Sequence, residues 1–189
     1  MRRRGILDSI PLFIPAIPFG FVLGVAIIDS GMEPLIGWSS SWIIYGGAAQ
    51  LTLVTLLGAG AASAAVIAAL VVNSRHVLYS LALATTFQKQ PAWFRWVGSA
   101  LLIDQVFVLA ESRKHLEPRD FRQYYLATGL FFLVTWNVVV ALGLVIGPAV
   151  PTEWGLGFAV PVMFTGMLVA GLIGDRSRTR NPKVVAAVV

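Results

Sequence analysis

The strongest constraint on this chain is a group of polar residues inside a long apolar run. Asn73, Arg75 and His76 interrupt the apolar segment 62–86. If this segment crosses a bilayer, Arg75 lies near mid-depth, where insertion scales give a cost of roughly 2.5 to 3.5 kcal/mol. Because such a charge is usually kept for a substrate or ion path, Arg75 is the first candidate functional residue. The alternative is an arginine that a neighbouring helix neutralises and that only locks packing.

Helical geometry gathers the polar side chains of this segment on one face. At about 100° per residue, five of them fall within an arc of about 160°, namely Asn73, Arg75, His76, Tyr79 and Ser80. Lipid cannot satisfy a polar face at this depth, so the face must look into protein or water. The segment therefore predicts a polar interior site.

Composition places the chain in a membrane. Of its 189 residues 57% are hydrophobic and 12% are charged, and its mean hydropathy is +0.79, whereas soluble domains carry about 25% charged residues. The chain has no cysteine, and His76 and His115 have no partner at ligand spacing, so we expect neither a disulfide, nor a metal site, nor a cofactor. The net charge of +5 lies mostly in short loops, which is typical of membrane topology and not of nucleic-acid binding.

The hydropathy pattern predicts an all-α integral membrane protein with a single transmembrane domain over residues 1–189. Six crossings are expected, at 10–28, 38–58, 62–86, 96–109, 124–146 and 154–173. The final VVAAVV resembles the start of a truncated seventh span. Three spans in a first half (about 10–86) and three in a second half (about 96–174) suggest a repeat, which would be inverted because three is odd.

The first predicted span contains several helix breakers. Pro11, Pro15 and Pro18 each remove a backbone donor, and Gly20 and Gly24 loosen the helix further. Transporters place such broken spans at a binding site near the midplane, so Pro18 and Gly20 are candidate site residues. Prolines are also common in ordinary membrane helices, and a mere kink is the alternative.

Three further polar residues fall inside predicted spans. Gln50 and Asn137 either hold helices together or contact a ligand. Asp104 is the natural counter-ion of Arg75, with pairing to loop cations as its rival. We expect one central cavity. The candidate binding residues are Pro18, Gly20, Gln50, Asn73, Arg75, His76, Tyr79, Asp104 and Asn137.

Loop charges predict the orientation of the chain. With a cytoplasmic N-terminus, eleven Lys and Arg residues fall in inner segments, which are 2–4, 113–122 and 176–183. Only Lys89 and Arg95 fall in outer loops. The positive-inside rule therefore predicts that the N-terminus is cytoplasmic.

Three stretches together resemble a known family. They are Ile17-Pro18-Phe19-Gly20 with Gly24, Gly47-Ala48-Ala49-Gln50, and Asn73-Ser74-Arg75-His76-Val77-Leu78-Tyr79-Ser80. They resemble the AzlC family, the larger membrane subunit of two-component exporters of branched-chain amino acids. The resemblance implies a small AzlD-like or YgaH-like membrane partner and the bacterial inner membrane. Gln105 departs from the family, where Glu often follows the Asp.

The leading hypothesis is a secondary transporter that exports an apolar amino acid in exchange for protons. Arg75 would bind the carboxylate of the substrate, and Asp104 or carbonyls near Pro18 would bind its ammonium. The partners expected are the amino acid, the bilayer, the small subunit and a second copy of the chain. Two alternatives are an intramembrane enzyme, with His76 as general base beside Ser80 and Asp104, and a structural subunit without transport.

Overall fold

The computed structural model describes residues 1–149, and every regular element within them is a helix. In chain order these are α1 (Arg2–Phe13), α2 (Ala16–Asp29), α3 (Pro34–Ile43), α4 (Gly47–Gly58), α5 (Ala62–Asn73), α6 (Arg75–Gln88), α7 (Ala92–Ala100), α8 (Asp104–Ser112), α9 (Pro118–Ile146) and the 3-10 turn η1 (Gly147–Ala149). Two stretches there are long and apolar enough to cross a membrane, Ala62–Gln88 and Pro118–Ala149, and the bent pair α1 and α2 makes a third. The predicted spans after residue 150 lie outside the described residues.

The interrupted first span that the sequence predicts is confirmed. α1 and α2 meet at an angle of 68°, and the break falls at Ile14 and Pro15. Pro15 is the residue before the first turn of α2. Pro18 does not break the helix, because it lies in the first turn of α2, where backbone N–H groups have no intrahelical acceptor.

The second predicted span, 38–58, is a hairpin of two short helices. α3 and α4 are separated at residues 44–46, where Tyr45 adopts a φ of 41°. Gly58, the last residue of α4, packs against Ser30: a Cβ atom added to Gly58 would lie 2.9 Å from the Cβ of Ser30. Because α3 begins just after Ser30, the hairpin starts and ends at the same end of the molecule, and the prediction of one continuous crossing is wrong.

The fourth predicted span, 96–109, is a second hairpin, formed by α7 and α8. Gln90, just before α7, donates from Nε2 to the carbonyl of Pro118 at 2.9 Å and accepts from Arg122 Nη1 at 3.1 Å. α8 ends at Ser112, six residues before Pro118. Both ends of this hairpin therefore lie at the start of α9, and the predicted crossing between loops 87–95 and 111–122 is wrong.

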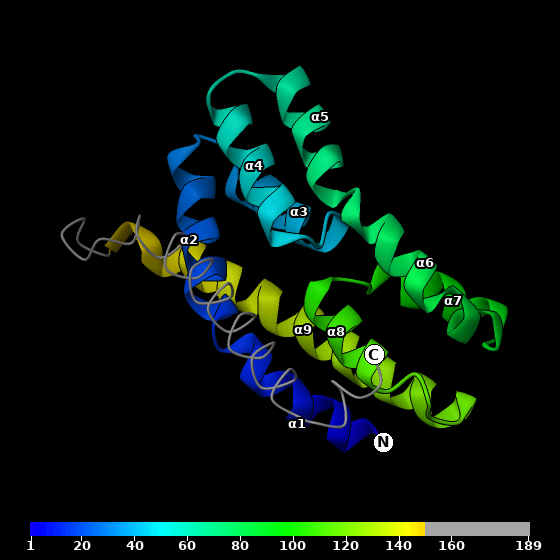
Figure 1. Ribbon diagram of the computed structural model, residues 1–189. Coiled ribbons are helices and arrows are strands. Elements are labelled where there is room, and N and C mark those ends of the chain that lie inside the picture. The colour runs from blue at the N-terminus through cyan, green and yellow to red at the C-terminus, as the bar shows by residue number, and fades with distance from the viewer. Residues whose placement is uncertain (150–189) are drawn as a thin grey trace, which may run out of the picture.

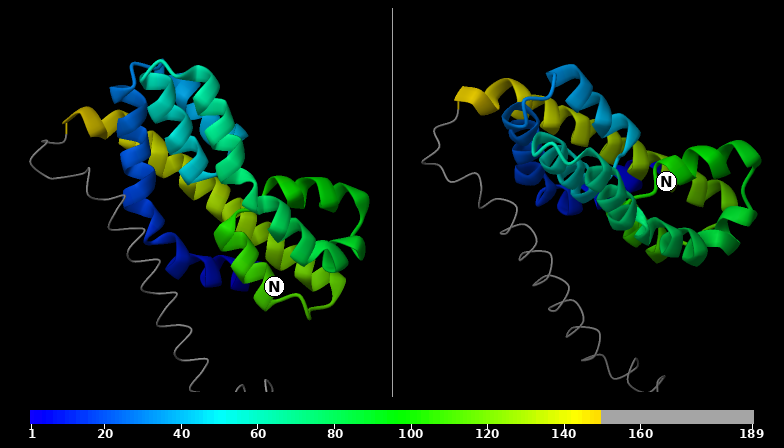
Figure 2. Two further views of the ribbon diagram at one scale, coloured as in Figure 1. Left: turned by 45° about the horizontal axis from the view of Figure 1, so that its top comes forward. Right: turned by 90° about the horizontal axis from the view of Figure 1, so that it is seen from above.

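The two hairpins enter the bundle from opposite ends, and α9 packs against α1, α2, α3, α7 and α8. α1 runs beside the N-terminal half of α9, and α2 crosses its C-terminal half (Figures 1 and 2). The starts of α1 and α9 and the end of α6 lie at the lower right of Figure 1. We call this the basic end. Every described Lys and Arg except Arg75 belongs to segments at this end, namely Arg2, Arg3, Arg4, Lys89, Arg95, Arg113, Lys114, Arg119 and Arg122.

The opposite end carries acidic residues. Asp29 ends α2 and Glu33 caps α3, and the α4–α5 turn lies beside them at the top of Figure 1. Charge is thus strongly polarised along the described part of the chain. The gathering of Lys and Arg at one end is the pattern that the positive-inside rule describes for helices that span a bilayer.

Candidate functional site

The interruptions of the helices meet at one cavity of about 310 Å³. It is bordered by the bend between α1 and α2, the turns of both hairpins, the start of α6 and the middle of α9. The lining residues are Phe13, Ala16, Phe19, Tyr45, Gly46, Gly47, Ala48, Arg75, His76, Tyr79, Ile103, Asp104, Gln105, Phe132 and Trp136. Sites formed by discontinuous helices in this way are typical of secondary transporters.

An ion pair in the wall of the cavity joins α6 to α8. Arg75 Nη2 lies 2.9 Å from Asp104 Oδ2, and the Tyr79 hydroxyl donates to Asp104 Oδ1 at 2.6 Å. Asp104 is also the first residue of α8, where the helix dipole stabilises negative charge. The Arg75 and Asp104 side chains are 34% and 29% exposed, so both groups remain accessible. The predicted pairing of these two residues is therefore found.

His76 and Tyr79 complete the polar face of α6. His76 Nδ1 lies 3.0 Å from the carbonyl oxygen of Asn73. Because a carbonyl only accepts, this contact is a hydrogen bond in the tautomer whose Nδ1 carries the proton, and in that tautomer Nε2 is an acceptor. Nε2 is buried and has no hydrogen-bond partner within residues 1–149. The Tyr79 ring stacks on Phe107 with centroids 4.4 Å apart, which holds its hydroxyl toward Asp104.

Hydrogen-bond donors gather on the other side of the cavity, at the start of α4. Gly46 and Gly47 line the cavity. The first backbone N–H groups of a helix have no intrahelical acceptor, and no side-chain hydrogen bond caps those of α4. Trp136 Nε1 on α9 and Arg75 Nε on α6 are further buried donors, and neither has a hydrogen-bond partner within residues 1–149. A Cβ on Gly47 would lie 2.8 Å from the Trp136 ring. This set of donors suits an anionic group such as a carboxylate.

The remaining wall is apolar. Phe13, Phe19 and Phe132 line the cavity beside Trp136, and the Phe19 and Trp136 rings lie 5.7 Å apart. The opposite charges of Arg75 and Asp104 offset each other. The cavity therefore offers a nearly neutral, dipolar polar region next to an aromatic one.

Four of the nine predicted site residues line this cavity, namely Arg75, His76, Tyr79 and Asp104. Two others lie just behind its lining. A Cβ on Gly46 would lie 2.8 Å from Asn73 Oδ1, and one on Gly20 would lie 3.3 Å from the Trp136 ring. The other three, Pro18, Gln50 and Asn137, do not line it.

Gln50 and Asn137 make structural contacts. The Gln50 amide donates to Ser40 Oγ and Ser41 Oγ at 2.7 Å each, joining the two arms of the first hairpin. Asn137 is buried in α9, where its amide donates to the carbonyl of Leu133 at 2.8 Å. Pro18 is exposed.

Sequence reasoning missed the hairpin turns and the aromatic wall. Gly46 and Gly47 were the available signal, because adjacent glycines allow a turn before a helix. Tyr45, with its positive φ, is held there by a hydrogen bond from its hydroxyl to the carbonyl of Gly129 at 3.2 Å. No pattern in the sequence distinguishes Phe13 or Trp136 from ordinary core residues.

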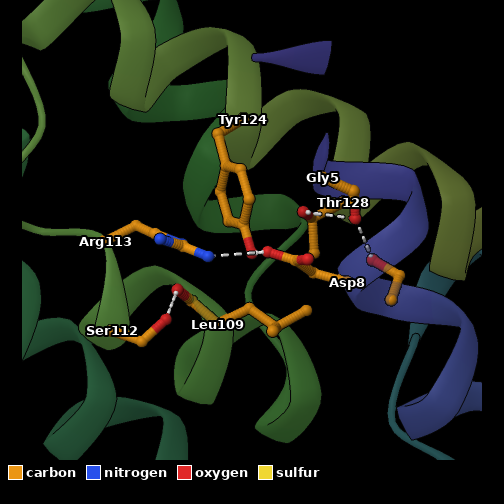
Figure 3. A network of polar contacts seen from close by, with 8 residues as sticks. Gly5, Asp8, Leu109, Ser112, Arg113, Tyr124 and Thr128 are labelled. Atoms are coloured by element: carbon orange, nitrogen blue, oxygen red, sulfur yellow. Dashed lines mark hydrogen bonds and ion pairs between the residues drawn. The ribbon is translucent and has the colours of Figure 1, made fainter. Parts of the chain in front are cut away.

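A second polar network, centred on Asp8, lies outside the lining of the cavity (Figure 3). Asp8 Oδ2 accepts from Arg113 Nη2 at 3.0 Å and from the Tyr124 hydroxyl at 2.9 Å. The Tyr124 hydroxyl and, after it, the Asp8 carboxylate beside the Arg113 guanidinium raise the pKa of Arg113. The network joins α1 and α9 to the end of α8, whose other end carries Asp104. α8 is thus tied by an ion pair at each end.

The described residues offer little for the enzyme alternative. Within residues 1–149 there is no group of three or more His, Asp or Glu residues that could hold a metal ion. Ser80 is exposed and is not among the residues that line the cavity. Among the described residues, no serine lines the cavity beside His76.

Comparison with known proteins gives a consistent result. The family model described as AzlC protein matches residues 11–150. The inner membrane protein YgaZ of Escherichia coli (strain K12) is 33% identical over 98% of this chain and 78% of its own length. An uncharacterized membrane protein of Archaeoglobus fulgidus is 28% identical over 94% of this chain and 79% of its own length. No solved structure matches.

Proposed function

Because the chain belongs to the AzlC family, we propose that it is a secondary transporter that exports branched-chain or similar apolar amino acids across the inner membrane. It would act as the larger subunit beside a small AzlD-like or YgaH-like membrane protein, and in exchange for protons. The observation that carries this proposal is the accessible Arg75–Asp104 pair in a cavity formed by interrupted helices.

A zwitterion is the substrate class that this pair suits. The substrate carboxylate would bind the Arg75 guanidinium and the donors at the start of α4, and its ammonium would bind Asp104. The substrate would thereby replace each member of the ion pair with a group of the same charge, so no charge stays unpaired. The aromatic wall around Phe132 and Trp136 would receive the apolar side chain.

Proton exchange follows from competition at Asp104. The unprotonated carboxylate binds an ammonium, and the protonated carboxyl does not. A proton that reaches Asp104 from the outer side would therefore displace the substrate there, and loss of that proton on the inner side would restore the site. Substrate and proton would thus bind alternately, as antiport requires.

The chain path supports a revised membrane topology. We propose that α1 with α2, α5 with α6, and α9 cross the bilayer, and that the hairpins α3–α4 and α7–α8 re-enter from the outer and the cytoplasmic side. Residues 34–88 and 92–146 are each a hairpin followed by a long helix. They are equal in length, and a Trp is the fifth residue of each. They would form an inverted repeat with a boundary near residue 90.

Labelling of introduced cysteines tests this topology, and the chain's lack of native cysteines gives a clean background. Lys89→Cys and Lys114→Cys should both react with an impermeant thiol reagent from the cytoplasmic side. Ser30→Cys should react from the outer side. Labelling of Lys89→Cys and Lys114→Cys from opposite sides would show that α7 and α8 cross the bilayer, and would refute the second re-entrant hairpin.

Counterflow in proteoliposomes tests the function. Vesicles that contain the chain, with and without its small partner, are loaded with unlabelled leucine and given labelled amino acids. Labelled leucine, isoleucine and valine should accumulate transiently, whereas lysine and glutamate should not, because each carries a net charge that the neutral cavity does not balance. The proposal fails if no apolar amino acid exchanges under either condition.

A further inference from the structure

A groove at the basic end has features that the transport site does not use. It has a volume of about 470 Å³ and lies against the first turns of α9. Its lining includes Arg2 of α1, Trp93 of α7, and Arg119 and Arg122 of α9. Neither Glu117 nor Asp120, the acidic residues nearest in sequence, is among its lining residues. The groove therefore concentrates positive charge.

Arg122 is held in place before any ligand binds. Its Nη1 donates to Gln90 Oε1 at 3.1 Å, and its guanidinium lies 5.9 Å from the centre of the Trp93 ring. Gln90 is itself fixed by its hydrogen bond to the Pro118 carbonyl. The hydrogen bond uses one nitrogen of the guanidinium, and the Trp93 ring restricts its position. A planar fork fixed in this way is suited to phosphate.

The floor of the groove changes from charged to apolar along α9. Leu126 and Leu130 follow Arg122 at intervals of four residues, so they lie on the same face of the helix, one and two turns deeper in the bundle. Both line the groove, and Leu130 is 50% exposed. Trp93, beside the arginines, is 54% exposed, as expected of an aromatic side chain at a membrane interface.

We propose that this groove binds one anionic phospholipid. The phosphate would lie between Arg119 and Arg122, with Arg2 closing the site from α1, and one acyl chain would follow Leu126 and Leu130 along α9. A free anion would leave the apolar floor empty, and an acidic peptide would not extend into the hydrocarbon layer. A phospholipid matches both parts of the groove.

The test measures lipid binding to delipidated full-length chain in neutral detergent. The probes are phosphatidylglycerol, phosphatidylcholine and inorganic phosphate, and the readouts are native mass spectrometry and the shift in melting temperature. One phosphatidylglycerol should bind and raise the melting temperature, whereas phosphatidylcholine and phosphate should have little effect. Equal binding of phosphatidylcholine, or equal stabilisation by phosphate, would overturn the proposal.

Two variants with a matched control localise the site. Arg119→Gln and Arg122→Gln should each weaken phosphatidylglycerol binding roughly fivefold, as expected for loss of one cation near an anionic headgroup. Arg95→Gln removes the same charge at the same end of the chain, outside the groove, and should leave binding unchanged. Arg119 is exposed, so its variant remains informative if Arg122→Gln also loosens α7. Equal weakening by Arg95→Gln would show that phosphatidylglycerol binding depends only on the overall positive charge of this surface, and would refute the site.

Discussion

Replacement of Arg75 by Lys is expected to abolish most transport while the protein still folds. Lysine keeps the positive charge but loses the planar fork that binds Asp104 and, as proposed, the substrate carboxylate. The loss of a charge-assisted hydrogen bond costs about 2 kcal/mol, which corresponds to about a 30-fold increase in the half-saturating substrate concentration. The measurement is leucine counterflow at several concentrations, with folded yield from size-exclusion chromatography as the parallel readout.

Controls separate substrate binding from packing. Arg95→Lys makes the same exchange on α7, outside the cavity, and should keep normal flux. The double variant Arg75→Gln with Asp104→Asn removes both charges together and so avoids an unpaired buried charge. If Arg75 binds substrate, this double variant folds but does not transport. Near-normal flux in it would show that the pair only locks α6 to α8.

The hydropathy pattern identified the helices but not the hairpins, and the reason is physical. Residues 38–58 contain no Asp, Glu, Lys or Arg and are mostly apolar, so two short helices with a three-residue turn have the same average hydropathy as one crossing. Only the chain path distinguishes them. Ser40 and Gln50 would lie about 15 Å apart along a straight helix, and their direct hydrogen bond requires the chain to reverse.

The sequence also predicts some of the site residues better than others. Arg75 and Asp104 could be found from sequence, because a charge at bilayer depth is costly wherever the chain folds and needs an opposite charge nearby. Gln50 and Asn137 are also polar at apparent bilayer depth, but the amide N–H groups of each donate to a neighbouring hydroxyl or to a carbonyl of the same helix. An uncharged amide in an apolar segment is therefore weaker evidence of a site than an ionised group is.

The location of the basic loops is another feature that the sequence alone does not predict correctly. If every predicted span is a crossing, Lys89 and Arg95 fall in an outer loop. In the structure the hydrogen bonds of Gln90 bring this loop to the start of α9. The charge asymmetry becomes stronger as a result, because all described cations outside the cavity then lie at one end.

The packing of α2 against α9 leads to the second prediction with a large expected effect. Gly24 and Gly143 face each other where these helices cross. A Cβ on Gly143 would lie 2.2 Å from the carbonyl oxygen of Phe21, and one on Gly24 would lie 2.4 Å from that of Val140. Both clashes are with backbone, which cannot rotate away as a side chain can. Such small-residue contacts are how membrane helices approach closely.

Gly143→Leu should therefore destabilise the protein by about 3 kcal/mol or more, at the upper end of the cost of overpacking. Separation of α2 from α9 would also move Phe19 and Trp136, which line the cavity, so transport should fall with stability. Val145→Leu places a leucine on the same helix at a position that is 79% exposed, and it should leave both unchanged. Thermal unfolding in detergent, followed by tryptophan fluorescence, measures the difference. If Gly143→Leu melts at the same temperature as the unmodified chain, α2 and α9 do not cross at these glycines, and the cavity between them is not formed as described.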